Sequence, residues 1–242
     1  METVIIDDEH KRDNDRLKFS IYLSFLITVL FGFLKFAAWA FDIDEKVFEL
    51  GILPRNISGL RGIIFSPLIH GDAGHYFGNA IPLFVLSVLI IYFYRQFYFK
   101  VLLLVWLLDG VGVWLIGREV YHIGASGVVY GLAFFAFFSG VLKKNRNMLA
   151  MSMLVLFLYG SMIWGMYPLE NGVSWEAHLA GFLTGTLMAV YFRKSGPNDD
   201  PVPEWMNEEE TVDEEITLIE KNSDAENENV VSINYEFKKK SE

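Results

Sequence analysis

The chain has 242 residues, of which 52% are hydrophobic and 16% aromatic, and its formal net charge is −10. This hydrophobic share is high for a soluble domain, and the apolar residues arrive in blocks. The sequence contains no cysteine, which excludes disulfides and thiolate metal sites.

Six apolar blocks follow one another along the chain, each close to the ~20 residues with which a helix crosses a ~30 Å hydrocarbon core. A soluble helix would carry a polar stripe every 3.6 residues, and in lipid only a helix satisfies its own backbone. The blocks are 19–41, 75–94, 97–116, 124–142, 148–167 and 175–192. We predict an all-α membrane protein with six transmembrane helices and a long outer loop, 42–74, between helices 1 and 2.

The first block has a second interpretation, because "AWA" at 38–40 is similar to the cleavage site of a signal peptide. Its length exceeds the usual apolar region of 7–15 residues, and Lys35 interrupts it. We therefore expect a retained helix, preceded by a cytoplasmic segment at 1–18.

Loop charges predict the orientation, because basic residues collect on the cytoplasmic side. One side of the six-helix arrangement carries eleven bases and the other carries four, Lys46, Arg55, Arg61 and Arg118. Both termini are thus expected in the cytoplasm, with the protein in the plasma (inner) membrane. Loop 42–74 then lies outside, and its stretch "GIIFSPLI" is expected to rest partly on the membrane surface.

The excess acid is confined to residues 195–242, which hold 15 acidic and 4 basic side chains. This segment has little apolar periodicity, so we predict an acidic, disordered cytoplasmic tail. Partner binding is the alternative role for the tail.

Polar residues stand near the outer ends of helices 2, 4 and 6, where they are costly and often functional. Asn79, Ser126 and His178 come early in their blocks, and a rise of ~1.5 Å per residue places them at similar depth. His75 lies one turn before Asn79, on the same face. Three helices far apart in sequence therefore bring polar groups to one level.

Small residues predict close contact between helices 4 and 6. Gly127 and Gly131 form one pair, and Gly181 and Gly185 form another on roughly the face of His178. Such contact would bring the His178 imidazole within reach of a serine hydroxyl, the geometry of a nucleophile activated by a general base.

Acyl transfer also needs donors for the developing oxyanion. The candidates are the Ser126 backbone N–H at a helix start and the side chains of His75 and Asn79. Gly124 and Gly127 permit a close approach of the substrate carbonyl. Taken singly, Ser126 could be helix filler bonded to the preceding turn, His75 an interfacial histidine, and Asn79 an interhelical hydrogen-bonding group.

These residues resemble the rhomboid family of intramembrane serine proteases. The resemblance consists of three motifs on helices 2, 4 and 6: H-x4-H-x3-N (His70, His75, Asn79), G-x-S-G with a later tyrosine (Gly124, Ser126, Gly127, Tyr130), and A-H-x-x-G (Ala177, His178, Gly181). It covers a rhomboid-like membrane domain at 19–194. The family's Trp-Arg pair is absent from the first outer loop, which keeps only Arg61.

The resemblance implies a Ser126–His178 dyad without an acidic third member, and an oxyanion hole lined by His75 and Asn79. It further implies that Tyr130 stacks on His178 and that His70 organises the outer loop. Substrates would be transmembrane proteins entering sideways from the lipid bilayer. We expect no cofactor, metal or nucleic-acid partner, and the sequence does not predict an oligomeric state.

Two other functions compete with this interpretation. A proteolytically inactive, client-binding relative would share the fold, although both Ser126 and His178 are present. A transporter would require repeats or a path of charges through the bundle, which the sequence lacks. Asp109 is interpreted as a buried hydrogen-bonded or protonated acid nearer mid-membrane than the serine, and His122 as a loop residue. Glu176 is not nominated as a triad acid, because i,i+2 neighbours on a helix do not face each other.

Overall fold

The structure is a computed structural model that describes residues 2–41, 43–168 and 172–198. Within these ranges the chain is helical and contains no strand, and a single antiparallel bridge joins Ile52 to His122. The all-α prediction is confirmed for this part of the chain. The predicted acidic tail lies outside the described residues beyond position 198.

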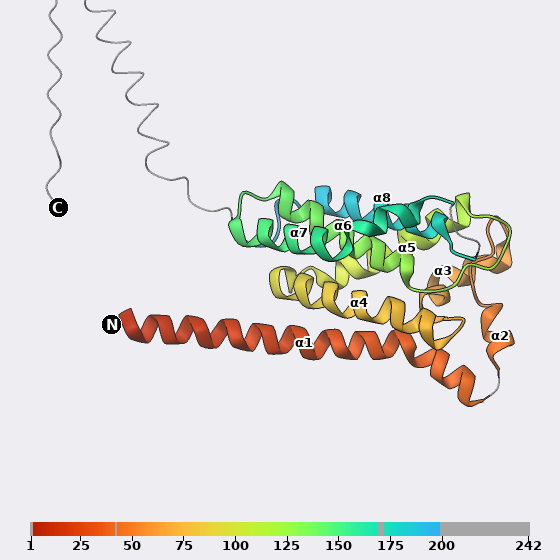
Figure 1. The fold of residues 1–242 in the computed structure, drawn as a ribbon, viewed down its shortest axis with the longest axis horizontal. Helices are drawn as coiled ribbons and strands as arrows, with labels where there is room; N and C mark the ends of the chain where they lie inside the picture. The colour runs from red at the N-terminus through yellow and green to blue at the C-terminus, as the bar shows by residue number, and fades with distance from the viewer. Residues whose placement is uncertain (1, 42, 169–171, 199–242) are drawn as a thin grey trace, which may run out of the picture. The chain divides into compact units, whose positions relative to one another are not determined.

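Six long helices form a bundle with shorter segments gathered at one end (Figure 1). The long helices are α1 (Glu2–Ala40), α4 (Ala73–Tyr94), α5 (Tyr98–Ile116), α6 (Ser126–Leu142), α7 (Arg146–Tyr159) and α8 (Trp175–Tyr191). The shorter ones are α2 (Asp44–Phe48), the 3-10 turn η1 (Ile57–Arg61), α3 (Gly62–Phe65), η2 (Ser66–Leu68) and η3 (Gly160–Met166).

Four helices are long and apolar enough to span a bilayer: Lys11–Phe33, Ala73–Tyr94, Tyr98–Ile116 and Arg146–Met166. Helices α6 and α8 have 17 residues each, which is near the lower limit for a span. Large apolar side chains cover the outside of the bundle, among them Tyr22, Ile81 and Phe157. An apolar exterior of this extent is typical of a surface that faces lipid.

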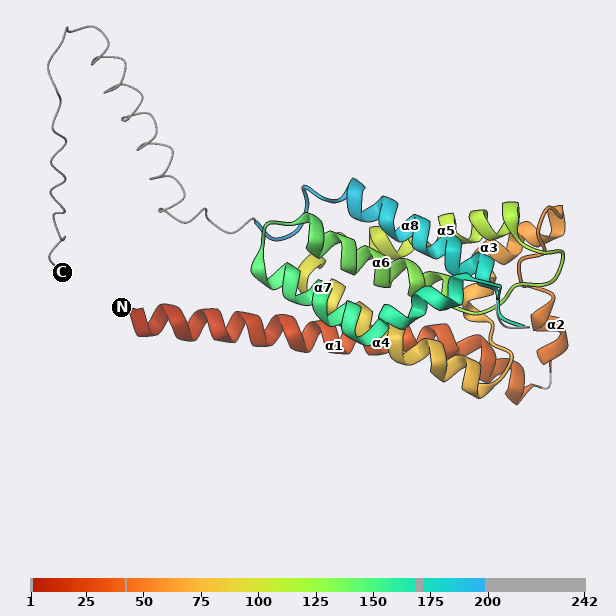
Figure 2. The same ribbon diagram turned by 45° about the horizontal axis from the view of Figure 1, so that its top comes forward.

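Helix α6 is the central element, since it packs against α4, α5, α7 and α8, whereas α1 packs mainly against α4 (Figure 2). The closest contact is between α6 and α8. A Cβ atom added at Gly181 would collide with the carbonyl oxygen of Gly127, and one at Gly185 with that of Gly131. The backbones therefore touch, as the glycine spacing predicts.

Side-chain caps fix where three of these helices begin. Asp72 accepts a hydrogen bond from the His75 N–H at the start of α4, Asn145 does so for α7, and Ser174 for α8. Helix α6 has no side-chain cap. It begins at Ser126 and not at the predicted residue 124, because Gly124 has a φ of +103° that is incompatible with a right-handed helix.

Two further boundaries differ from the prediction. Helix α1 starts well before residue 19 and is continuous to Ala40. The apolar block 148–167 is not one helix, because α7 ends at Tyr159 and the chain continues as the 3-10 turn η3. Both parts of this block are apolar, so hydropathy alone does not reveal the break.

Candidate active site

Ser126 is the first residue of α6 and is half-buried. Because no side chain caps this helix, the N–H groups of its first turn have no side-chain acceptor. The turn before it is fixed by a hydrogen bond of 2.9 Å from the Gly124 N–H to the Ser66 carbonyl. The serine hydroxyl thus sits beside free backbone donors at a helix N-terminus.

His178 lies in the first turns of α8 and is buried, with 7% of its surface exposed. Its ring stacks on Tyr130 of α6, with centroids 4.0 Å apart and an interplanar angle of 4°. Its Nδ1 is 2.7 Å from the carbonyl oxygen of Gly165, which only accepts. A neutral His178 therefore carries its proton on Nδ1 and presents Nε2 as the acceptor that a general base requires.

Two contacts bring the starts of α6 and α8 together. They are the Tyr130–His178 stack and the Gly127–Gly181 backbone contact, and both Gly127 and Tyr130 lie in the first turns of α6, directly after Ser126. Ser126 and His178 do not share a hydrogen bond in this structure. Catalytic hydrogen bonds are often long before substrate binds and shorten in the complex.

His75 and Asn79 border the turn that precedes Ser126. The Gly71 N–H donates to His75 Nδ1 at 3.4 Å, so a neutral His75 carries its proton on Nε2. A Cβ atom added at Gly124 would lie 2.6 Å from His75 Nε2 and 3.7 Å from the Asn79 amide nitrogen, so both nitrogens border this glycine. One N–H of Asn79 donates to the His75 carbonyl at 3.1 Å, which leaves its second N–H available.

His70 lies behind His75 and does not border Gly124 itself. Its ring meets those of His75 and Tyr76 edge-on, with centroids 5.2 and 5.4 Å apart. It is 2% exposed, and neither ring nitrogen has a hydrogen-bond partner. Burial lowers the pKa of His70 from 6.5 to about 4, so the ring is neutral near pH 7.

Asp109 of α5 is buried against Gly127, at the level of the serine. This corrects the expectation that it lies nearer mid-membrane. The reason is that α6 starts well below the outer end of α5, which continues beyond Asp109 to Ile116. Asp109 is buried, as expected, and its Oδ1 has no hydrogen-bond partner; the expected hydrogen-bonded or protonated state of this acid stays a prediction.

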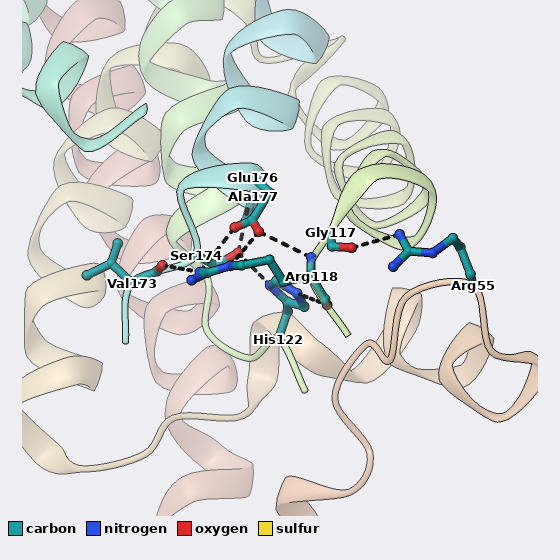
Figure 3. A network of polar contacts seen from close by, with 8 residues as sticks. All are labelled: Arg55, Gly117, Arg118, His122, Val173, Ser174, Glu176 and Ala177. Carbon is teal, nitrogen blue, oxygen red and sulfur yellow. Dashed lines mark hydrogen bonds and ion pairs between the residues drawn. The ribbon is translucent and has the colours of Figure 1, made fainter. Parts of the chain in front are cut away.

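The sequence interpretation missed a polar network that joins the loop after α5 to the start of α8 (Figure 3). Glu176 is fully buried and is bound by Arg118, and His122 is bound to Ser174. His122 lies in the loop between α5 and α6, as expected, and it is buried there, with 4% of its surface exposed. Two sequence features could have indicated this network: Glu176 is an acid inside an apolar block, and Arg118 is a base in a short loop.

Among the described residues, no group of three or more His, Cys, Asp or Glu side chains is arranged to hold a metal ion. The polar groups gathered around Ser126 are suited to acyl transfer: a hydroxyl, an imidazole with an acceptor nitrogen, and several N–H donors.

Comparison with known families gives one match, in which the Rhomboid domain covers residues 58–195 of the chain. The chain belongs to the rhomboid family. The match includes the three motif segments on α4, α6 and α8, so the predicted membership is confirmed.

Several similar proteins come from mycobacteria and are named as uncharacterized proteins. Proteins of Mycobacterium bovis and Mycobacterium tuberculosis are 37% identical over 149 residues, which is 57% of this chain and 62% of theirs. One of Mycobacterium leprae is 35% identical over 140 residues, 54% of this chain and 55% of its own length. The matched region thus spans less than two thirds of the length of these relatives.

Proposed function

We propose that this rhomboid protein is an intramembrane serine endopeptidase that cleaves peptide bonds in or near transmembrane segments of other proteins. The observation that carries the proposal is the state of His178. The Gly165 carbonyl and the Tyr130 ring hold it, from a 3-10 turn and from the helix that begins with Ser126. This arrangement leaves Nε2 as a proton acceptor.

In the proposed reaction, His178 Nε2 takes the proton of the Ser126 hydroxyl as its oxygen attacks the substrate carbonyl. The oxyanion receives hydrogen bonds from the Ser126 N–H, His75 Nε2–H and the free N–H of Asn79. Collapse breaks the C–N bond, and His178 returns its proton to the leaving amine. Water then hydrolyses the acyl-enzyme with His178 again acting as base.

The membrane arrangement belongs to the same proposal. Helices α1, α4, α5, α6, α7 with η3, and α8 would be the six spans, with both termini in the cytoplasm and the site near the outer face. Substrates would enter from the surrounding lipid. The charge difference between the two loop sides and the apolar exterior of the bundle support this arrangement.

The test is cleavage of a transmembrane substrate by purified protein in liposomes, together with labelling by a fluorophosphonate. Ser126→Ala is expected to abolish both, and His178→Ala to abolish cleavage. Ser139→Ala, a second serine on α6, is the matched control and is expected to cleave normally. Undiminished cleavage by Ser126→Ala would refute the mechanism.

The oxyanion role makes a graded prediction. Asn79→Ala is expected to lower kcat by about 10²–10³-fold, since one donor is lost while nucleophile and base remain. Steady-state kinetics on the same substrate measure this. A kcat within threefold of wild type would remove Asn79 from the oxyanion hole.

A client-binding protein without protease activity is the second candidate. The absence of a Ser126–His178 hydrogen bond in this structure is the observation that favours it. Capture of a transmembrane client by wild type and Ser126→Ala alike, with neither cleavage nor labelling, would support this alternative.

A further inference from the structure

The loop between α5 and α6 is joined to the first turn of α8 by an ion pair (Figure 3). Arg118 Nε donates to Glu176 Oε1 at 2.7 Å and its Nη2 donates to Oε2 at 3.3 Å, so the pair is bidentate. The Arg118 backbone N–H also donates to Oε1, at 3.2 Å, and Nη2 reaches the Val173 carbonyl at 2.8 Å. One arginine therefore holds both the acid and the chain that leads into α8.

The ion pair is asymmetric in burial. The Glu176 side chain is 0% exposed, whereas that of Arg118 is 48% exposed. A buried carboxylate is tolerated only when it is paired and hydrogen-bonded, so Glu176 depends on Arg118. Lysine could not make the same contact, because the two parallel hydrogen bonds require a planar guanidinium.

A second link runs parallel to the first, through the cap of α8. Ser174 Oγ accepts from the Ala177 N–H at 3.3 Å and lies 2.6 Å from His122 Nδ1. His122 Nε2 is 3.0 Å from the Arg118 carbonyl and so carries the ring proton, which makes Nδ1 the acceptor of the Ser174 hydroxyl hydrogen. The loop between α5 and α6 thus binds the start of α8 at two places, Ser174 through His122 and Glu176 through Arg118.

The position of these links gives them their significance. His122 lies four residues before Ser126, while Ser174 and Glu176 lie four and two residues before His178. None of their side chains is hydrogen-bonded to the side chain of Ser126 or His178, and the Ser174 carbonyl accepts from the His178 backbone N–H at 3.3 Å. We infer that Arg118 and Glu176 are positioning residues that fix the start of α8, and with it His178, relative to the loop that delivers Ser126.

This inference rests on the proposed function, because positioning matters through the chemistry that it serves. A misplacement of about 1 Å between reacting groups can cost 10²-fold in rate. The stacked ring of Tyr130 and the Gly165 carbonyl orient His178 within α8, but they do not set where the helix begins. The Arg118–Glu176 pair supplies that constraint.

The kinetic test compares Glu176→Gln, Arg118→Ala and Arg118→Lys, with rates normalised to the fraction of enzyme that a fluorophosphonate labels. We expect kcat to fall about tenfold or more in Glu176→Gln and Arg118→Ala, less in Arg118→Lys, and KM to stay within twofold. Glu119→Gln is the matched control, because Glu119 is the next residue and pairs with Arg55 in an exposed ion pair of 3.4 Å. It is expected to have wild-type kinetics.

A second readout needs no catalysis. Nitrogen-15 NMR of labelled histidine, with His178→Ala used for assignment, reports which ring nitrogen of His178 is protonated. We expect the Nδ1–H tautomer in the wild type and in Glu119→Gln, and a mixture of tautomers in Glu176→Gln and Arg118→Ala. An unchanged His178 tautomer in both of these variants overturns the inference, whether or not the wild type cleaves. A wild type without Ser126-dependent cleavage would count against the proposed function alone.

Discussion

Three of the histidines at this site are held in one tautomer by neighbouring groups of the backbone. The Gly71 N–H faces Nδ1 of His75, the Gly165 carbonyl faces Nδ1 of His178, and the Arg118 carbonyl faces Nε2 of His122. An N–H neighbour makes the ring nitrogen an acceptor, and a carbonyl makes it a donor. The backbone thus prepares His75 to donate and His178 to accept at Nε2.

His70 differs from these three because neither of its nitrogens has a partner. Its pKa is about 4 in the folded protein and 6.5 when the ring is exposed. Between pH 4 and pH 6.5 the folded state therefore binds fewer protons at His70 than the unfolded state does. The stability that it contributes is therefore complete above pH 6.5 and is lost as the pH falls toward 4. His70→Phe keeps a ring against His75 and Tyr76 and does not titrate.

We expect His70→Phe to match the wild type in thermal unfolding at pH 8 and to exceed it at pH 5 by about 2 kcal/mol. Unfolding in mild detergent at both values measures the difference. An equal pH dependence in the two proteins would show that His70 gains a proton without penalty in the folded state.

At the residue scale the sequence was informative where a motif spaced its members along one helix face. His75 with Asn79 and Ser126 with Tyr130 are such pairs, and each shares a face as the i,i+4 spacing requires. It was uninformative for Arg118 and Glu176, which are 58 residues apart and meet only because α5, α6 and α8 converge. Tertiary convergence of this kind leaves no local pattern.

Among the elements, the contact between α6 and α8 is the one that a single methyl group would disturb most. Gly181→Ala would bring a Cβ atom into collision with the Gly127 carbonyl. Both groups belong to helix backbones, so no side-chain rotation can relieve the collision. We expect a loss of about 1–3 kcal/mol of stability and at least a tenfold lower kcat, because His178 is one turn away on α8.

Gly78→Ala is the control at this scale, since a Cβ at Gly78 of α4 would meet nothing within 4 Å. This substitution is expected to be neutral or to stabilise the helix by up to about 1 kcal/mol. Thermal unfolding and cleavage assays on both variants decide the matter. Equal behaviour of the two would mean that α6 and α8 do not need their close contact.

Apolar blocks predicted the existence of the long helices well and their ends less well. The start of α6 moved to Ser126 because of the backbone angle at Gly124, and α7 ended at Tyr159 inside an unbroken apolar run. Hydropathy reports which residues lipid and core accept, and it carries no information on whether a turn is α or 3-10.

For the molecule as a whole, the orientation proposed from loop charges is open to direct measurement because the chain has no cysteine of its own. Ser58→Cys in the outer loop is expected to react with an impermeant maleimide in intact cells. Lys144→Cys, between α6 and α7, is expected to react only after permeabilisation. The reverse pattern would invert the proposed topology.

The 3-10 turn η3 contacts both members of the stacked Tyr130–His178 pair. Its Met162 carbonyl accepts from the Tyr130 hydroxyl at 2.8 Å, and its Gly165 carbonyl holds His178. If α7 moved away from the bundle as a rigid body together with η3, His178 would lose its hydrogen bond to the Gly165 carbonyl. If the proposed substrate enters on this side, the chain must therefore bend near Gly160, so that η3 keeps its contacts with Tyr130 and His178 while α7 moves.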